Sequence, residues 1–218
     1  MSDLTPAALV VFARHHGLAT GPMLQRAGVG RTRRRRLIEA ELIEVIHRCV
    51  YRLAGTPDSL ESRCVALCLA HPSGFITGPT GGRLTGLRRM GADARLHFSV
   101  PHGSNIGPID GVVLRQTTVI EASHVQQRGD GIRLASPPRL AFDLAADLAE
   151  LDHASAVEQL LAERRCTLAT LGVIGRRLVH PGRPGSSQFL HTMSQRISGG
   201  PLESHPEVRL AQALRARG

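Results

Sequence analysis

The sequence predicts an α+β fold that begins with a winged helix-turn-helix. Two short amphipathic segments, residues 5–15 and 21–27, are each followed by glycine. A basic run, residues 31–36, comes next and reads Arg-Thr-Arg-Arg-Arg-Arg. Two β-patterned runs, residues 43–47 and 50–54, then follow. Three helices and a hairpin in this order are the elements of a winged helix-turn-helix.

The first predicted helix has a clear N-terminal signal. Thr5 can cap it, and Pro6 takes the first helical position, where the missing backbone N–H is tolerated. Leu9, Val10 and Phe12 supply its expected apolar stripe. We therefore expect this helix to be the scaffold for the two that follow.

The basic run predicts a helix that reads DNA. On a helical wheel, Leu37 and Ile38 define the buried side. We expect the residues on the opposite side of the helix and on its flanks to face DNA. They are Thr32, Arg33, Arg35 and Arg36, and Arg31 at the start of the run is a further candidate. Arg34 lies on the apolar side instead, so we expect it to pair or to pack, and to support folding more than binding.

The hairpin supplies further candidate contacts. Arg48 and Arg52 flank its tip, and we expect them to contact the backbone or the minor groove of double-stranded DNA. An arginine can bind guanine through two hydrogen bonds or neutralise a phosphate. The sequence leaves open which arginine does which, and a solvated basic helix face without a specific ligand is the alternative.

The composition favours a nucleic-acid partner and excludes several kinds of enzyme. The formal charge is +9 and the isoelectric point is about 11.1. Arginine provides all of the 27 basic residues, and the absence of lysine excludes a Walker A loop, a Schiff-base enzyme and a kinase-type phosphate lysine. Aromatic residues make up only 3%, so duplex DNA is a better partner than single strands bound by stacking.

The cysteines and histidines do not predict a metal site. Four cysteines lack the paired spacings of a zinc site, and we interpret them as reduced thiols. Cys64 and Cys68 lie four apart on a predicted helix over residues 59–71, where they fit buried small side chains better than a two-ligand metal clip. The histidines have no metal-binding spacing. We therefore expect no metal and no cofactor.

No apolar run reaches the roughly 18 to 20 residues that span a bilayer. The N-terminus lacks the basic and hydrophobic regions of a signal peptide. We therefore expect no membrane partner and a cytoplasmic location.

The remaining chain predicts a mixed α/β domain followed by C-terminal helices. Helix-like and strand-like segments alternate over residues 60–148, and two amphipathic helices are expected at residues 152–165 and 167–179. A break rich in glycine and proline follows. The expected division is a winged helix-turn-helix domain, a mixed α/β domain and C-terminal helices, at residues 1–56, 59–182 and 183–218.

Several motifs resemble the AbiEi-type antitoxins of type IV toxin–antitoxin, or abortive-infection, systems. The first two are Thr20-Gly21-Pro22-Met23-Leu24 and Ile46-His47-Arg48-Cys49-Val50-Tyr51, which resemble that family's N-terminal winged helix. Family members commonly have glycine where Cys49 and Glu41 stand, so the hairpin geometry is expected to differ locally.

Further segments extend the resemblance over most of residues 5–180. They are a small-residue helix at 78–87, a strand at 96–100 followed by Pro101, and the helix at 136–145. In that last helix, we interpret Asp143 as a cap or an ion-pair partner of Arg139, not as a catalytic carboxylate. The resemblance implies a DNA-binding repressor of its own promoter that opposes a nucleotidyltransferase-like toxin, without needing to touch it.

Residues 204–210, which contain Glu207, resemble the first helix of a very-short-patch-repair-like endonuclease domain. Such a nuclease needs an aspartate on one strand and an acid plus lysine on the next. Asp110 and Glu121 match this pattern only faintly, because Ser123 stands where lysine is needed. We expect no enzyme activity from this chain. The alternative function is the DNA-targeting half of a truncated endonuclease, and the oligomeric state is left open.

Overall fold

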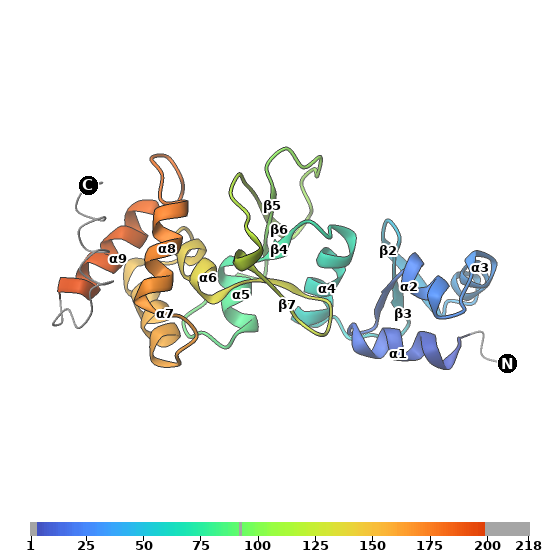
Figure 1. Ribbon diagram of the computed structural model, residues 1–218. Coiled ribbons are helices and arrows are strands. Elements are labelled where there is room, and N and C mark those ends of the chain that lie inside the picture. The colour runs from blue at the N-terminus through green and yellow to red at the C-terminus, as the bar shows by residue number, and fades with distance from the viewer. Residues whose placement is uncertain (1–3, 92, 199–218) are drawn as a thin grey trace. The chain divides into compact units, whose positions relative to one another are not determined.

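The computed structural model of the protein describes residues 4–91 and 93–198, and the chain divides into two compact units (Figure 1). The first unit comprises Met1–Phe75 and Gln127–Arg133, and the second contains the rest. Both units combine helices with strands, so the predicted α+β class is confirmed.

Helices surround an antiparallel sheet in the first unit. Its described residues place three strands in the order β1-β3-β2, so that β3 lies in the middle. The elements are α1 (Pro6–Arg14), β1 (Leu18–Thr20), α2 (Gly21–Arg26), α3 (Arg31–Glu39), β2 (Ile43–His47), β3 (Val50–Leu53) and α4 (Leu60–Ala70). All but β1 follow predicted segments, and β1 forms where a break between two helices was expected.

Helix α1 begins as predicted but buries a different face. The Thr5 hydroxyl accepts a hydrogen bond from the Ala8 amide at 3.0 Å, and Pro6 takes the first helical position. Ala8 and Phe12, four residues apart, are the residues that α1 buries in the core. Leu9 and Val10 are 46% and 67% exposed, so their predicted place in the apolar stripe is wrong. At about 100° per residue, they are turned away from the face that Ala8 and Phe12 define.

Helix α3 ends with a left-handed residue at Glu41, whose φ is +54°. The Glu41 amide donates to the carbonyl of Ile38 at 3.0 Å, and the Leu42 amide donates to that of Leu37 at 2.9 Å. This is the Schellman arrangement, which glycine usually completes. Cys49, in the hairpin turn, also has a positive φ of +65°. Both positions therefore adopt the backbone conformation typical of glycine while they carry side chains.

Helix α4 belongs to the first unit. Ser59 caps it, and the helix packs against β1, β2 and β3. The first unit consequently continues to Phe75, beyond the predicted boundary at residues 56–59. The apolar pattern of α4 indicates that one face is buried, but it does not identify the sheet that covers this face.

The α4 cysteines are buried, as interpreted from the sequence. Cys64 and Cys68 are both almost completely inaccessible. Burial raises the pKa of the Cys68 thiol to about 11, so the thiol stays protonated near neutral pH. A metal ligand would need the thiolate.

The second unit combines parallel strands with a group of helices. Strands β5 and β6 pair in parallel, with Leu96 opposite Val112, within a sheet of order β6-β5-β4-β8-β7 among the described residues. The elements are β4 (Phe75–Ile76), α5 (Gly78–Leu84), β5 (Leu96–Pro101), β6 (Val112–Thr117), η1 (Ala122–His124), β7 (Val125–Gln127), β8 (Arg133–Ala135), α6 (Pro137–Leu144), α7 (Glu150–Ala162), α8 (Leu168–Leu178) and α9 (Ser186–Ser198). One end residue of each of β4, β7 and β8 is assigned to the first unit.

Helix α6 occupies the centre of the second unit. Its Arg139 Nε donates to a carboxylate oxygen of Asp143 at 2.9 Å, and Thr77 donates to the other oxygen of that carboxylate. The predicted role of Asp143 as an ion-pair partner is confirmed. A Cβ at Gly81 would lie 2.9 Å from the Leu140 side chain, so the small residues of α5 allow α6 to pack closely.

Helices α7, α8 and α9 pack against α6. The Phe142 and Phe189 rings lie 5.2 Å apart, and buried His153 bridges the Thr192 hydroxyl and the Ala141 carbonyl. Helix α9 therefore joins the second unit, although the sequence placed it in a separate C-terminal part. Glu207 and its segment lie outside the described residues.

Within residues 4–91 and 93–198, no helix has the length and apolar character needed to cross a bilayer.

The left-handed end of α3 generates the first prediction. Glu41→Gly should raise the free energy of unfolding by about 0.5 to 1 kcal/mol, because glycine adopts positive φ without the steric cost of a Cβ. Urea denaturation measures this change. The control is Ala40→Gly at φ −89°, which should lower stability. Equal effects of the two substitutions would contradict the conformational explanation.

Candidate nucleic-acid interface

A tight turn positions helix α3 after α2. Gly28, at φ +80°, ends α2, and the Val29 amide returns to the Leu24 carbonyl at 2.8 Å. Gly30 then precedes the first residue of α3. The helix buries Leu37 and leaves the rest of its length exposed or half-exposed. Leu37 therefore anchors α3 while most of the helix surface stays accessible.

Arg34 connects α3 to the elements beneath it. Its Nη1 donates to the carbonyl of Gly21 at 3.1 Å and to that of Val29 at 3.0 Å. Its guanidinium carbon lies 5.8 Å from the centre of the Tyr51 ring, within the range of a cation–π interaction. Arg34 therefore packs against its own unit, as one of the two expectations had it, and its guanidinium binds backbone carbonyls where an acidic partner was the other expectation.

The residues predicted to face DNA lie on the accessible side of α3. Thr32, Arg35 and Arg36 are exposed, as is Arg31, and Arg33 is partly exposed. Some of them border an open depression of about 350 Å³, which is lined by Arg31, Thr32, Arg34, Arg35, Ile38 and Tyr51. Two of these residues, Ile38 and Tyr51, were not among those predicted from the sequence. Ile38 was assigned to the buried side but is 37% exposed, because Leu37 alone reaches the core.

The positive charge of α3 is poorly compensated. Arg35 pairs with Glu39 at 2.9 Å, and both side chains are largely exposed, so the pair is weak. No side-chain hydrogen bond or ion pair joins the guanidinium group of Arg31, Arg33 or Arg36 to the residues that the structure describes. The first turn of α3 contains no acidic residue. Cations there oppose the helix dipole, so an anion bound at this surface would stabilise the helix.

The two arginines predicted for the wing differ in their surroundings. Arg48 is exposed in the turn between β2 and β3. Arg52 lies opposite Glu44 in the β2–β3 ladder, and its Nε donates to the Glu44 carboxylate at 2.7 Å. This hydrogen bond raises the pKa of Arg52. Arg48 is thus free to meet a ligand, whereas Arg52 must first exchange its carboxylate partner.

The acidic residues weighed as nuclease candidates do not form a site in the described structure. Asp110 is exposed before β6, and Glu121 lies 3.3 Å from Arg177 in an ion pair. In the described part of the chain, no three His, Cys, Asp or Glu side chains come together as they would around a metal ion.

Comparisons with known proteins identify a fold. No family model matches the sequence, and no curated protein matches it. Among solved structures, the protein is similar to the RV2827C protein from Mycobacterium tuberculosis, with a TM-score of 0.58 and 16% sequence identity. The match covers 100% of this chain and 82% of that chain. At this identity, the likeness shows the fold alone.

The contacts of Arg34 generate the second prediction. Arg34→Ala should lower the free energy of unfolding by about 1 to 2 kcal/mol, because it removes two hydrogen bonds to carbonyls of the turn and of α2. Arg36→Ala removes the same charge from the exposed face and should change stability by less than about 0.5 kcal/mol. Urea denaturation of both variants checks this. An Arg34→Ala variant as stable as Arg36→Ala would show that Arg34 does not hold α3 in place.

Proposed function

We propose that this protein is a transcriptional regulator whose first unit is a winged helix-turn-helix that binds double-stranded DNA through α3. One observation carries the proposal: α3 exposes a group of arginines that its own unit leaves almost without acidic partners. Unpaired like charges on one face do not stabilise a helix, so the fold itself does not explain them. A polyanion that matches a helical face explains the arrangement.

The order of elements in the first unit supports this proposal. The order α1-β1-α2-α3-β2-β3 places α3 directly after a short turn, where a helix-turn-helix has its recognition helix (Figure 1). The exposed face of α3 is continuous over more than one turn. The major groove of DNA is about 12 Å wide and admits a helix of this kind.

The exposed residues divide into two kinds of contact. Thr32, Arg33 and Arg36 have no acidic neighbour to release, so they are the candidates for base edges and nearby phosphates. Arg35 would exchange its exposed pair with Glu39 for a phosphate. Arg48 would contact the backbone or the minor groove beside the helix.

The regulatory role follows from the resemblance to AbiEi-type antitoxins. In this proposal the protein represses its own promoter in the cytoplasm and opposes a nucleotidyltransferase-like toxin. The DNA-binding part of the proposal is supported by the residues of α3. The antitoxin part is supported by the motifs at residues 20–24, 46–51 and 136–145.

Fluorescence anisotropy with duplex DNA from immediately upstream of the gene tests the proposal. We expect the protein to prefer this duplex over a scrambled one by about a thousandfold. Arg33→Ala combined with Arg36→Ala should weaken binding by about 1 to 3 kcal/mol for each arginine that binds a base edge. For each arginine that neutralises a phosphate, the double substitution should reduce the slope of log K against log salt by about one.

Arg88→Ala is the matched control, because it removes one exposed arginine from the second unit. It should leave binding to the upstream duplex unchanged. Equal, steeply salt-dependent binding to native and scrambled duplexes would reduce the role to non-specific attraction. Undiminished affinity in the Arg33 and Arg36 double variant would remove α3 from the interface.

A further inference from the structure

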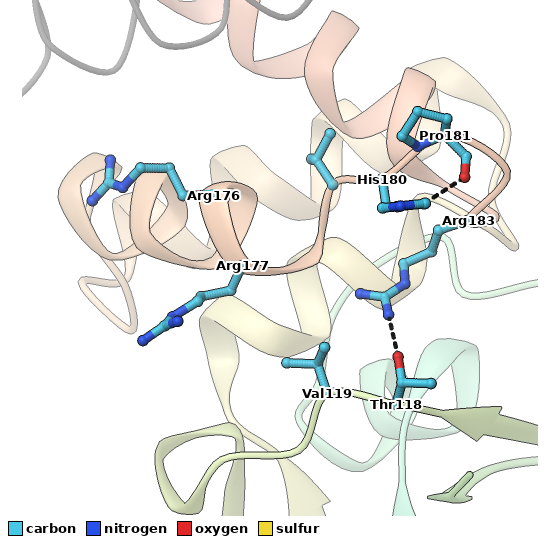
Figure 2. Close-up of a pocket in the computed structure, with 8 residues that line it drawn as sticks. Thr118, Val119, Arg176, Arg177, His180, Pro181 and Arg183 are labelled. Carbon is cyan, nitrogen blue, oxygen red and sulfur yellow. Dashed lines mark hydrogen bonds between the residues drawn. The ribbon is translucent and has the colours of Figure 1, made fainter.

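A second basic surface lies in the second unit, around a pocket of about 620 Å³ (Figure 2). One wall is the last turn of α8 and the loop that follows it. The other wall is the segment just after β6. The lining residues are Thr118, Val119, Arg176, Arg177, Val179, His180, Pro181 and Arg183. All of them belong to the second unit, so the pocket is separate from the candidate interface on α3.

Arg183 is held in place by uncharged partners. Its Nη1 donates to the Leu178 carbonyl at 2.9 Å, and its Nη2 donates to the Thr118 hydroxyl at 3.1 Å. Figure 2 shows the guanidinium reaching from the loop toward Thr118 across the pocket. By binding the Leu178 carbonyl, Arg183 also covers one of the free carbonyls at the end of α8, which would otherwise repel an anion. The guanidinium is therefore ordered before any ligand arrives.

The charge around the pocket is positive. Arg176 and Arg177 occupy the last turn of α8, and Arg177 pairs with Glu121 at 3.3 Å while 63% of its side chain stays exposed. Burial lowers the pKa of Arg183, and the positive charge of Arg139 lowers it further. The residues that line the pocket include Arg176, Arg177 and Arg183 and no acidic residue, so its lining carries an excess of positive charge.

The remaining surface of the pocket suits an organic group beside an anion. Val119, Val179 and Pro181 contribute apolar atoms. The Thr118 oxygen accepts from Arg183, so its own O–H remains able to donate to a ligand. The volume lies within the roughly 300 to 1,000 Å³ typical of small-molecule sites. The pocket thus combines two guanidinium groups and a hydroxyl with an apolar wall.

We propose that this pocket binds the phosphate group of an organic phosphate, with Arg183 and Thr118 contacting the phosphate oxygens. Arg177, whose exposed side chain points away from Arg183 in Figure 2, would leave Glu121 and turn toward the same phosphate. Guanidinium groups present pairs of N–H donors that match phosphate oxygens. A phosphate monoester carries a charge of about −1.5 to −2 near neutral pH. A ligand with this charge neutralises several arginines more fully than a ligand with one carboxylate does. The phosphate comes either from a free nucleotide or from a nucleic-acid backbone.

Calorimetric titration of the full chain with AMP, and with adenosine as the ligand that lacks the phosphate, tests binding of a free nucleotide. We expect AMP to bind and adenosine not to bind. Arg177→Gln and Arg183→Gln should each weaken AMP binding about tenfold, because each removes a charge-assisted hydrogen bond. Arg88→Gln, which removes an exposed arginine elsewhere in the second unit, should have no effect.

Glu121→Gln gives a test in the opposite direction. It releases Arg177 from its carboxylate partner and should tighten phosphate binding severalfold. Because Arg183 also bonds to the Leu178 carbonyl, its replacement can disturb the fold. Arg177 makes an exposed contact, so its variant keeps the test decisive, and Glu121→Gln retains a side-chain oxygen that can cap η1 next to buried His124.

Titration with a short duplex that lacks an operator sequence, at several salt concentrations, tests whether the phosphate belongs to a nucleic-acid backbone. If the phosphate belongs to nucleic acid, Arg177→Gln should reduce the salt slope for this duplex by about one while AMP stays unbound. The proposal is overturned if AMP and duplex binding are both the same in Arg177→Gln, Glu121→Gln and the unsubstituted protein. It is overturned equally if the protein binds neither. The α3 variants report on the first unit separately, so unchanged binding in Arg177→Gln and Glu121→Gln leaves the proposed function untouched, whereas absence of all duplex binding would contradict both proposals.

Discussion

The candidate interface depends on the contacts that hold α3 in place, because almost all of the surface of this helix is exposed. Leu37 is the residue of this helix that reaches the core. One buried leucine fixes the depth of a helix but leaves it free to rotate about the contact. Arg34 supplies the missing constraint, because its hydrogen bonds to Gly21 and Val29 and its place over Tyr51 tie α3 to the turn, to α2 and to β3. The exposed arginines keep their direction as a result.

Arginine serves two opposite purposes in this protein. Arg34 and Arg139 are at least partly buried, and their guanidinium groups are bound to fixed acceptors, the carbonyls of Gly21 and Val29 for one and the Asp143 carboxylate for the other. In such places a long side chain packs along its stem and satisfies its charge within the fold. The exposed arginines of α3 and α8 have weak partners or none among the described residues. Their charge remains available for an external anion.

The charge pattern of α3 is unfavourable for an isolated helix. Its first turn is basic, and arginines three and four positions apart lie on the same faces. Each such pair of like charges costs a few tenths of a kcal/mol in water. Departures from local preference of this kind concentrate at functional sites, where a ligand compensates for them. The pocket beside α8 likewise gathers Arg176, Arg177 and Arg183, and no acidic residue is among those that line it.

Sequence patterns identified what depends on neighbours along the chain, and packing decided the rest. The Thr5 cap, the helices of the first unit, the β2–β3 hairpin and the Arg139–Asp143 pair at four residues' spacing follow from local geometry, so they were predictable. The tertiary structure decided that Leu9 and Val10 are exposed and which sheet α4 covers. It also decided that Arg52 pairs with Glu44 and that Arg183 donates a hydrogen bond to Thr118. The physical reason is that a helix or strand forms from short-range hydrogen bonds and side-chain periodicity, whereas burial and charge pairing depend on which distant segment packs against it.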